Sequence, residues 1–264
     1  VSRGLGDVYK RQGHYSLEVF DVSSGNVRHV KSMVEWMNGD KKETFAGEPN
    51  GVTRSYGKIY VTNTGSRTDV FDAETYEFIT CIGTGTWGEG GYQTVHAFDV
   101  TASQGAVFIR DKRKLVVVLE QDVQPCSAAR VPIYSRSVNL QEAMGTYAVA
   151  ARNDGFLYVT AQNKNIIYLF DPADIRAGDT GFAPYLVTLG FEKSPQSIAF
   201  VGDRLFVTLR VDDKRSELWE ISPKNGKLLQ DFTDSMVYPE KIAGARHTLL
   251  VVDRATQTVK AIGL

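Results

Sequence analysis

One phrase of sequence recurs along this chain of 264 residues and restricts the folds open to it. The phrase is an aromatic and β-branched run, a polar turn and a second such run ending at Asp, as in residues 57–63 followed by 70–72. Further copies contain residues 105–109, 155–171, 205–221 and 249–253. Two such runs around a polar turn predict an antiparallel hairpin in every copy.

The spacing of the copies identifies the kind of repeat. Equivalent positions 48, 50, 48 and 44 residues apart are occupied by Val61, Ile109, Val159, Val207 and Val251. Periods of about 40 to 50 residues are typical of four-stranded propeller blades. Odd and even positions of the runs are both apolar, as in residues 115–119. This pattern indicates strands buried on both faces between neighbouring blades. We therefore predict an all-β fold, a β-propeller of four-stranded antiparallel blades with a period of about 48 residues.

The first twelve residues carry no such pattern, and residues 7–12 resemble a translated sequencing-library adaptor. We treat residues 1–12 as a non-native segment and 13–264 as a single propeller domain. The alternative is a native basic N-terminal arm. Residues 15–22 match only the second strand of the hairpin, so we expect a chain truncated at its N-terminus and six blades, within a range of five to seven.

Composition excludes several classes of function. No apolar run approaches the roughly 18 residues of a membrane span, and a net charge of −1 gives no electrostatic footprint for nucleic acid. The basic cluster at residues 110–114 also contains Asp111 and favours a solvated turn. Cys81 and Cys126 favour two independent buried thiols over a disulfide between neighbouring blades. Because metal-ligand spacings, phosphate loops and nucleophile elbows are missing from the sequence, we predict no cofactor and no metal.

Residues 60–63, with residues 70–72 and Thr75, resemble the YVTN family of β-propeller repeats. The glycine-rich stretch 83–91 with residues 96–111 resembles the NHL repeat instead. The resemblance implies an extracytoplasmic protein, periplasmic or on the cell surface. It is a weak guide to chemistry, because such propellers include cell-surface binding proteins, scaffolds and a few lactone hydrolases or lyases.

Candidate ligand-binding residues follow from two sets of positions. Polar residues that depart from the family pattern follow the first run of a copy, in the loop to its second run, at Arg110, Gln162 and Arg210. The turns before the inner strands place further polar or aromatic residues on the same loop face at Asn50, Trp87, Tyr92, His96, Gln196 and Glu240. One non-equivalent polar residue per blade suits an asymmetric pocket. Loop drift, or packing of Trp87 and Tyr92 between blades, would produce the same pattern.

These patterns support three hypotheses of function. The first is a non-catalytic propeller that binds a small molecule, a glycan or a protein partner on its funnel face. The second is a metal-dependent lactonase or lyase, for which Glu240, Asn50 and Asp99 are the available oxygen ligands, with His96 and Glu240 as a weak acid–base pair. The third is a scaffold or sensor module of a larger protein. The Asp residues that end the second strands at 21, 72 and 171 are expected to accept backbone N–H groups in turns.

Overall fold

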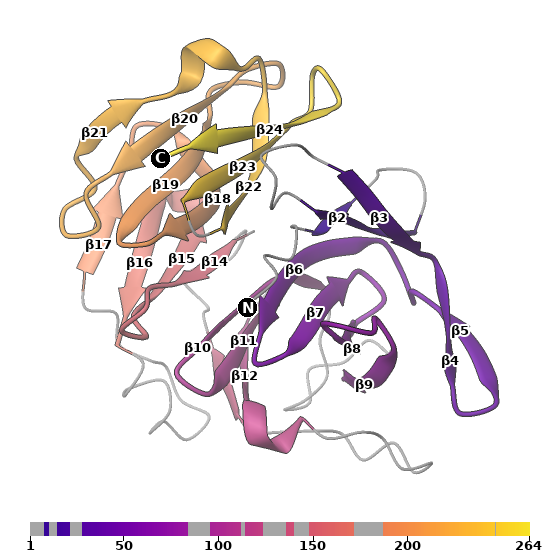
Figure 1. Cartoon of the computed structure of the whole chain (residues 1–264). Helices are drawn as coiled ribbons and strands as arrows, with labels where there is room; N and C mark the ends of the chain where they lie inside the picture. Colours follow the sequence, from indigo (N-terminus) through magenta and orange to yellow (C-terminus); the bar gives the residue numbers. More distant parts are fainter. Residues whose placement is uncertain are drawn as a thin grey trace. The chain divides into compact units, whose positions relative to one another are not determined.

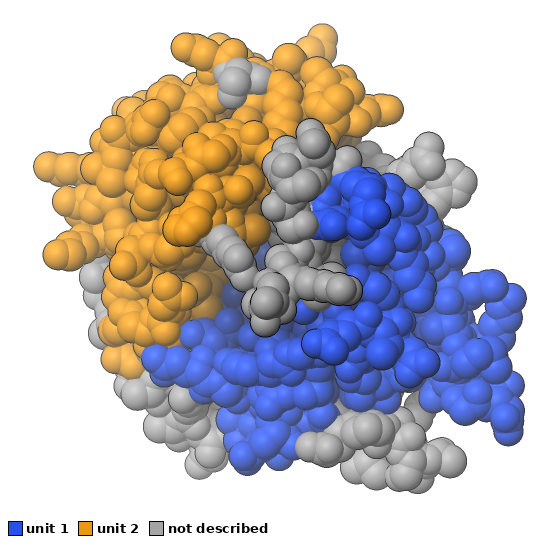
Figure 2. Space-filling view, viewed as in Figure 1, with its two compact units in different colours: residues 1–111, 116–137 blue, residues 112–115, 138–264 orange. Residues whose placement is uncertain are grey.

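The computed structural model describes residues 8–10, 15–21, 28–83, 96–111, 114–123, 136–139, 148–171, 187–245 and 247–264. The chain forms two compact units, one made of residues 1–111 and 116–137 and the other of residues 112–115 and 138–264 (Figure 2). Trp87, Tyr92 and Cys126 of the sequence predictions lie outside the described residues.

Four sheets contain four antiparallel strands each, hydrogen-bonded in the order in which they follow along the chain (Figure 1). Two of these sheets fall chiefly in unit 1. They are β6 (Pro49–Ser55), β7 (Lys58–Asn63), β8 (Arg67–Asp72) and β9 (Phe78–Ile82), then β10 (Ala97–Ser103), β11 (Ala106–Asp111), β12 (Lys114–Leu119) and β13 (Arg136–Asn139). The other two fall in unit 2. They are β14 (Val149–Ala151), β15 (Leu157–Ala161), β16 (Ile166–Phe170) and β17 (Val187–Gly190), then β18 (Ser194–Val201), β19 (Arg204–Arg210), β20 (Ser216–Ile221) and β21 (Leu228–Asp231).

The remaining strands form smaller sheets. Unit 2 ends with three strands, β22 (Pro239–Ala245), β23 (Thr248–Asp253) and β24 (Thr258–Gly263). Unit 1 begins with β1 (Val8–Lys10), β2 (Leu17–Asp21) and β3 (Arg28–Met33), followed by the hairpin β4 (Glu35–Asn38) and β5 (Lys41–Thr44). Within the described residues, short 3₁₀ turns lie at Glu120–Asp122 (η1), Gln162–Lys164 (η3) and Thr233–Ser235 (η4). Five successive sheets from β6 to β24 follow the repeat, within the predicted range of five to seven blades, and β1–β3 form a further sheet.

Both faces of the central strands are buried, as the apolar runs predict. In β19, Phe206 packs in one cluster with Leu249 and Val251 of β23. Its neighbour Val207 packs in another cluster with Tyr158 of β15. Successive side chains of a strand point to opposite faces, so β19 joins the sheets on either side of it within unit 2. The core of each unit consists of such layers between sheets.

A β-bulge recurs near the start of the inner strands. The pairing register skips Phe98 in β10, Gln196 in β18 and Glu240 in β22, and in β6 it passes over Asn50 and Gly51 opposite the single residue Thr62. A proline precedes Asn50, Gln196 and Glu240, and proline is tolerated at the first residue of a strand and at bulges. The extra residue bends the strand and redirects a side chain.

A threonine of the second strand of a sheet holds the start of the inner strand in three sheets, two of which contain the bulge. The hydroxyl oxygens of Thr62, Thr160 and Thr208 accept backbone N–H groups of Gly51, Ala148 and Ser197, over 2.9, 3.1 and 3.0 Å. All three threonines are fully buried. In the two sheets with the bulge, the Thr of the recurring phrase is therefore the partner of a backbone group that the bulge removes from the ladder.

Three local expectations can be compared with this fold. Asp72 accepts the N–H groups of Glu74 and Thr75, as predicted for the turn aspartates. Cys81 is a buried thiol. The solvated turn expected at residues 110–114 is wrong in part, since β11 continues through Asp111 and both Arg110 and Asp111 are buried. The apolar run that precedes Arg110 carries the strand further than the charge pattern suggested.

The close approach of β18 and β22 in unit 2 depends on a glycine. A Cβ on Gly244 would lie 1.8 Å from the carbonyl oxygen of Phe200, which is a backbone atom that no side-chain rotation moves. We expect Gly244→Ala to lower the free energy of unfolding by about 1–3 kcal/mol, as overpacking does. Gly263→Ala in β24 is the control, because nothing lies within 4 Å of its added Cβ. Equal stability of the two variants in urea unfolding would contradict this strand packing.

Candidate functional site

A polar cavity of about 380 Å³ lies at one end of the strands of unit 2. Its lining consists of five charged residues, two glutamines and a tyrosine, namely Gln162, Gln196, Arg210, Asp213, Tyr238, Glu240, Lys241 and Arg254. Its volume is within the range of small-ligand sites. We refer to this cavity as the strand-end pocket.

Three lining residues occupy the same backbone position in successive sheets. Gln162, Arg210 and Arg254 each follow the buried valine of the second strand by three residues, after Val159, Val207 and Val251. They lie where β15, β19 and β23 end. The repeated backbone therefore presents one amide and two guanidinium groups to the same side of the pocket.

Two further lining residues are bulge residues. Gln196 is the extra residue of β18 and Glu240 that of β22, and their positions in the two sheets are equivalent. The Oε1 atom of Gln196 is buried and has no hydrogen-bond partner among the described residues. An unsatisfied buried acceptor is costly, and a turn of this side chain toward the cavity would let its oxygen accept a hydrogen bond from a ligand or water.

Exposed ion pairs restrain the two arginines. Arg210 pairs with Asp213 in the loop after β19, and the side chains are 43% and 86% exposed. Arg254 lies 3.3 Å from Oε1 of Glu240 and over the ring of Tyr238, with 5.8 Å between guanidinium carbon and ring centroid. Lys241 has no ion-pair partner in the part of the chain that the structure describes. The pocket thus contains three cations and two carboxylates.

A buried carboxylate positions one wall of the pocket. Asp253 is fully buried at the end of β23, and its two oxygens accept the N–H groups of Val237 and Tyr238, each over 3.0 Å. Burial by itself would raise the pKa of Asp253, but these N–H groups and that of Thr256 hold the pKa below its ordinary value. The turn that carries Tyr238 and Glu240 depends on this ionised side chain.

Four of the predicted site residues are therefore brought together by unit 2: Gln162, Gln196, Arg210 and Glu240. Asn50, His96 and Arg110 belong to unit 1. Asn50 donates to the carbonyl oxygen of Ala97, and the backbone N–H of His96 donates to Asp111. The register gives the bulge position of β10 to Phe98, two residues after His96.

Arg110 is fully buried within β11, at the position that Thr62, Thr160 and Thr208 hold in other sheets. Burial lowers the pKa of its guanidinium to about 9, although Asp111 opposes this shift. It remains a cation at neutral pH. The residue two positions later is the equivalent of Gln162, so the sequence comparison placed Arg110 two positions too early.

The sequence did not indicate four lining residues. Arg254 follows the weakest copy of the repeat, and only its distance from Val251 could have identified it. Asp213 and Lys241 adjoin predicted positions without sharing their repeat position. Tyr238 lies two residues before Glu240 in the same turn and was not among the predicted site residues.

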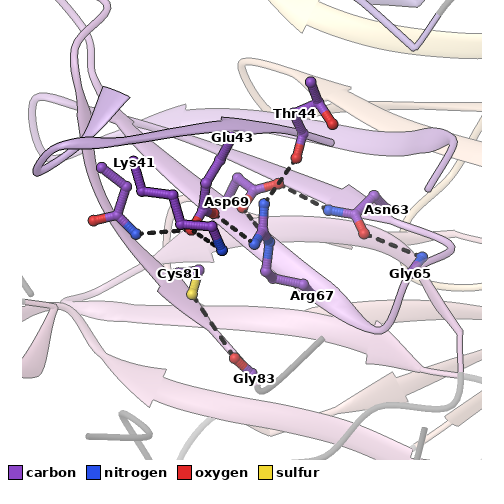
Figure 3. Close-up of polar contacts among 10 residues, drawn as sticks. Lys41, Glu43, Thr44, Asn63, Gly65, Arg67, Asp69, Cys81 and Gly83 are labelled. Carbon is purple, nitrogen blue, oxygen red and sulfur yellow. Dashed lines mark hydrogen bonds and ion pairs between the residues drawn. The ribbon is translucent and has the colours of Figure 1, made fainter. Parts of the chain in front are cut away.

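A second polar cluster, in unit 1, attaches the hairpin β4–β5 to the sheet β6–β9 (Figure 3). The buried Arg67 donates to Glu43 over 3.0 Å and to the Thr44 carbonyl over 3.1 Å, and its Nε lies 2.6 Å from Asp69. Although burial lowers it, the carboxylates of Asp69 and Glu43 raise the pKa of Arg67 overall. Since all these partners belong to the protein, we interpret the cluster as structural.

The described residues contain neither a membrane-spanning helix nor a cluster of metal-ligating side chains. None of their helices has the length and apolar character needed to cross a bilayer. None of their His, Cys, Asp and Glu side chains gather in groups of three that could hold a metal ion.

Comparisons with solved structures establish the fold as a β-propeller. The Cps50 (Swd1) β-propeller domain of Myceliophteria thermophila matches with a TM-score of 0.54 and 12% identity over 97% of this chain and 79% of that one. A putative 6-phosphogluconolactonase from Bacteroides fragilis matches with a TM-score of 0.61 and 14% identity over 97% of this chain and 76% of that one. No protein-family model and no curated protein matches the sequence. The YVTN and NHL resemblance thus stays a prediction within a propeller fold.

The ionised state of Asp253 makes unit 2 sensitive to acid. A carboxylate whose folded pKa is lowered stabilises the protein above its unfolded pKa of about 4, and this contribution disappears as pH falls through the folded pKa. We expect Asp253→Asn to cost about 1–3 kcal/mol at pH 7 and progressively less below pH 4 in urea unfolding. The control is Asp203→Asn at an exposed turn, which should leave the free energy of unfolding unchanged both at pH 7 and below pH 4. If Asp253→Asn lowered the free energy of unfolding equally at all pH values, the negative charge of Asp253 would not be the source of its contribution.

The Arg67 cluster gives a second stability prediction. Arg67→Met removes the buried guanidinium from Asp69 and leaves Glu43 with the more distant and exposed Lys41, and we expect it to lower the free energy of unfolding by about 3–5 kcal/mol. The control is Arg28→Met, since Arg28 is 76% exposed in its pair with Asp21 and surface pairs contribute about 0–1 kcal/mol. Chemical denaturation of both variants compares them directly. Similar losses of unfolding free energy in Arg67→Met and Arg28→Met would mean that the Arg67 cluster does not attach the hairpin β4–β5 to its sheet.

Proposed function

We propose that this chain is a β-propeller that binds a small polar molecule or a glycan in the strand-end pocket of unit 2. The observation that carries the proposal is the convergence of Gln162, Arg210 and Arg254 with the bulge residues Gln196 and Glu240. These side chains come from several segments of the chain, and most of them are polar at positions that the fold does not require to be polar. Convergent polar groups in a concave site are characteristic of ligand recognition.

The unsatisfied Oε1 of Gln196 supports binding over simple solvation. A buried acceptor without a partner costs more than a satisfied one, and a ligand hydroxyl or amine would supply the missing donor. Within the proposal, the protein acts outside the cytoplasm, periplasmic or at the cell surface, which rests on the family resemblance alone. A protein partner, or a role as scaffold or sensor, remains a broader alternative.

A hydrolytic function is the second candidate, and one comparison favours it. The Bacteroides fragilis structure carries the description putative 6-phosphogluconolactonase. For this chain, lactone hydrolysis would require Glu240 or a bound cation to activate water. Hydrolysis of a sugar lactone that depends on a divalent cation and is lost in Glu240→Gln would favour this alternative over binding alone.

A thermal-shift screen tests the binding proposal. The full chain is mixed with a panel of neutral sugars, sugar acids, amino acids and small dicarboxylates, and hits are titrated by calorimetry. We expect Gln196→Ala to weaken binding of a hit by about three- to tenfold, because it removes one hydrogen bond. The matched control is Gln230→Ala on the exposed strand β21. A panel without hits, or hits with the same affinity for Gln196→Ala as for the wild type, would contradict the proposal.

A further inference from the structure

We propose that the strand-end pocket recognises an acidic sugar, whose carboxylate replaces Asp213 and Glu240 as the partner of Arg210 and Arg254. This inference rests on the proposed function and specifies its ligand. It assigns the two arginines a common task, which is to hold one carboxylate between the ends of β19 and β23.

Both ion pairs are of a kind that a ligand can replace. The Arg210–Asp213 pair joins residues three apart in one loop, and the carboxylate of Asp213 is 86% exposed. The Arg254–Glu240 contact is long at 3.3 Å, and Arg254 is 56% exposed. Exposed pairs contribute little to stability because water screens both charges. Exchange for a ligand carboxylate therefore costs little.

The chemistry of the arginines selects a carboxylate. A guanidinium group presents a planar set of donors that matches the two oxygens of a carboxylate. Lys241 adds a third positive charge to the lining. Because the two protein carboxylates leave one cation without a partner among the described residues, an anion of one negative charge neutralises the pocket.

The rest of the lining selects hydroxyl groups. The amide of Gln196, whose Oε1 has no hydrogen-bond partner among the described residues, can accept a hydrogen bond from a ligand hydroxyl once the side chain turns toward the cavity. The amide of Gln162 can both donate and accept beside the arginines. Sulfate and acetate would satisfy the arginines but not Gln196. A uronic acid has both functional groups on one ring.

Isothermal titration calorimetry of the full chain with D-glucuronate, D-galacturonate, D-glucose and acetate tests this inference. We expect at least one uronate to bind about tenfold or more tightly than glucose and acetate. Arg210→Gln and Arg254→Gln should each weaken uronate binding by about tenfold or more. Glutamine is the suitable replacement because Gln162 occupies the same backbone position in the neighbouring sheet.

Two further variants separate charge at the site from charge nearby. Arg215→Gln removes the same charge from the loop that contains Asp213 but does not alter the lining, so uronate affinity should stay within about twofold of the wild type. Asp213→Asn removes a carboxylate that competes with the ligand for Arg210 and should leave uronate binding unchanged or tighter. Weaker binding in Asp213→Asn would overturn the exchange, because it would make Asp213 a contact of the ligand.

Other outcomes distinguish the inference from the function on which it rests. Equal binding of glucose and the uronates, unaffected by Arg210→Gln, would overturn the acidic-sugar inference while supporting a binding pocket. Binding of none of these compounds, together with a thermal-shift panel without hits, would overturn both. If a uronate binds as expected, tighter binding of a trigalacturonate than of galacturonate identifies a polysaccharide as the source, and the reverse identifies the free acid.

Discussion

The β-bulge at the start of the inner strands is the constraint on which the strand-end pocket depends. An extra residue removes one backbone N–H from the ladder, and a buried N–H without a partner is costly. Thr208 accepts that N–H from Ser197 and donates to the Glu240 carbonyl of the neighbouring sheet over 3.2 Å. One hydroxyl thus fixes the bulge of β18 and its distance from β22. The side chains of Gln196 and Glu240 are directed into the pocket by this arrangement.

The scaffold is repetitive, but the pocket is not. Buried positions such as Val159, Val207 and Val251 must remain apolar because sheets pack on both faces. Three residues later the chain leaves the strand, and exposed side chains there add little to the free energy of folding. Gln162, Arg210 and Arg254 can therefore differ in charge without a cost to the fold. Equivalent backbone positions with different side chains allow a symmetric scaffold to carry an asymmetric site.

The sequence predicted the sheets and half of the pocket lining because both follow from spacing. Val61 and its equivalents specify the second strand, and the polar residues beyond the strong copies identified Gln162 and Arg210. The start of each inner strand leaves no comparable signal, because the turns before these strands do not follow the spacing of the valines. The register places Phe98, and not His96, at the bulge of β10, and Arg110 lies within β11, two residues before the repeat position of Gln162. Contacts such as Arg210–Asp213 depend on loop conformation, which spacing does not specify.

The copies of the repeat fix the start of the inner strand in two ways. The hydroxyls of Thr62 and Thr208 accept the N–H that follows the extra residue, and that of Thr160 accepts the N–H of Ala148. The sheets of β11 and β23 have Arg110 and Val252 at that position, and there the next residue is an aspartate. Asp111 and Asp253 accept N–H groups just before the inner strand, from His96 and Tyr238. The pocket lies where a hydroxyl-fixed sheet adjoins a carboxylate-fixed one, so acid acts on the Tyr238 and Glu240 side and leaves the Gln196 side in place.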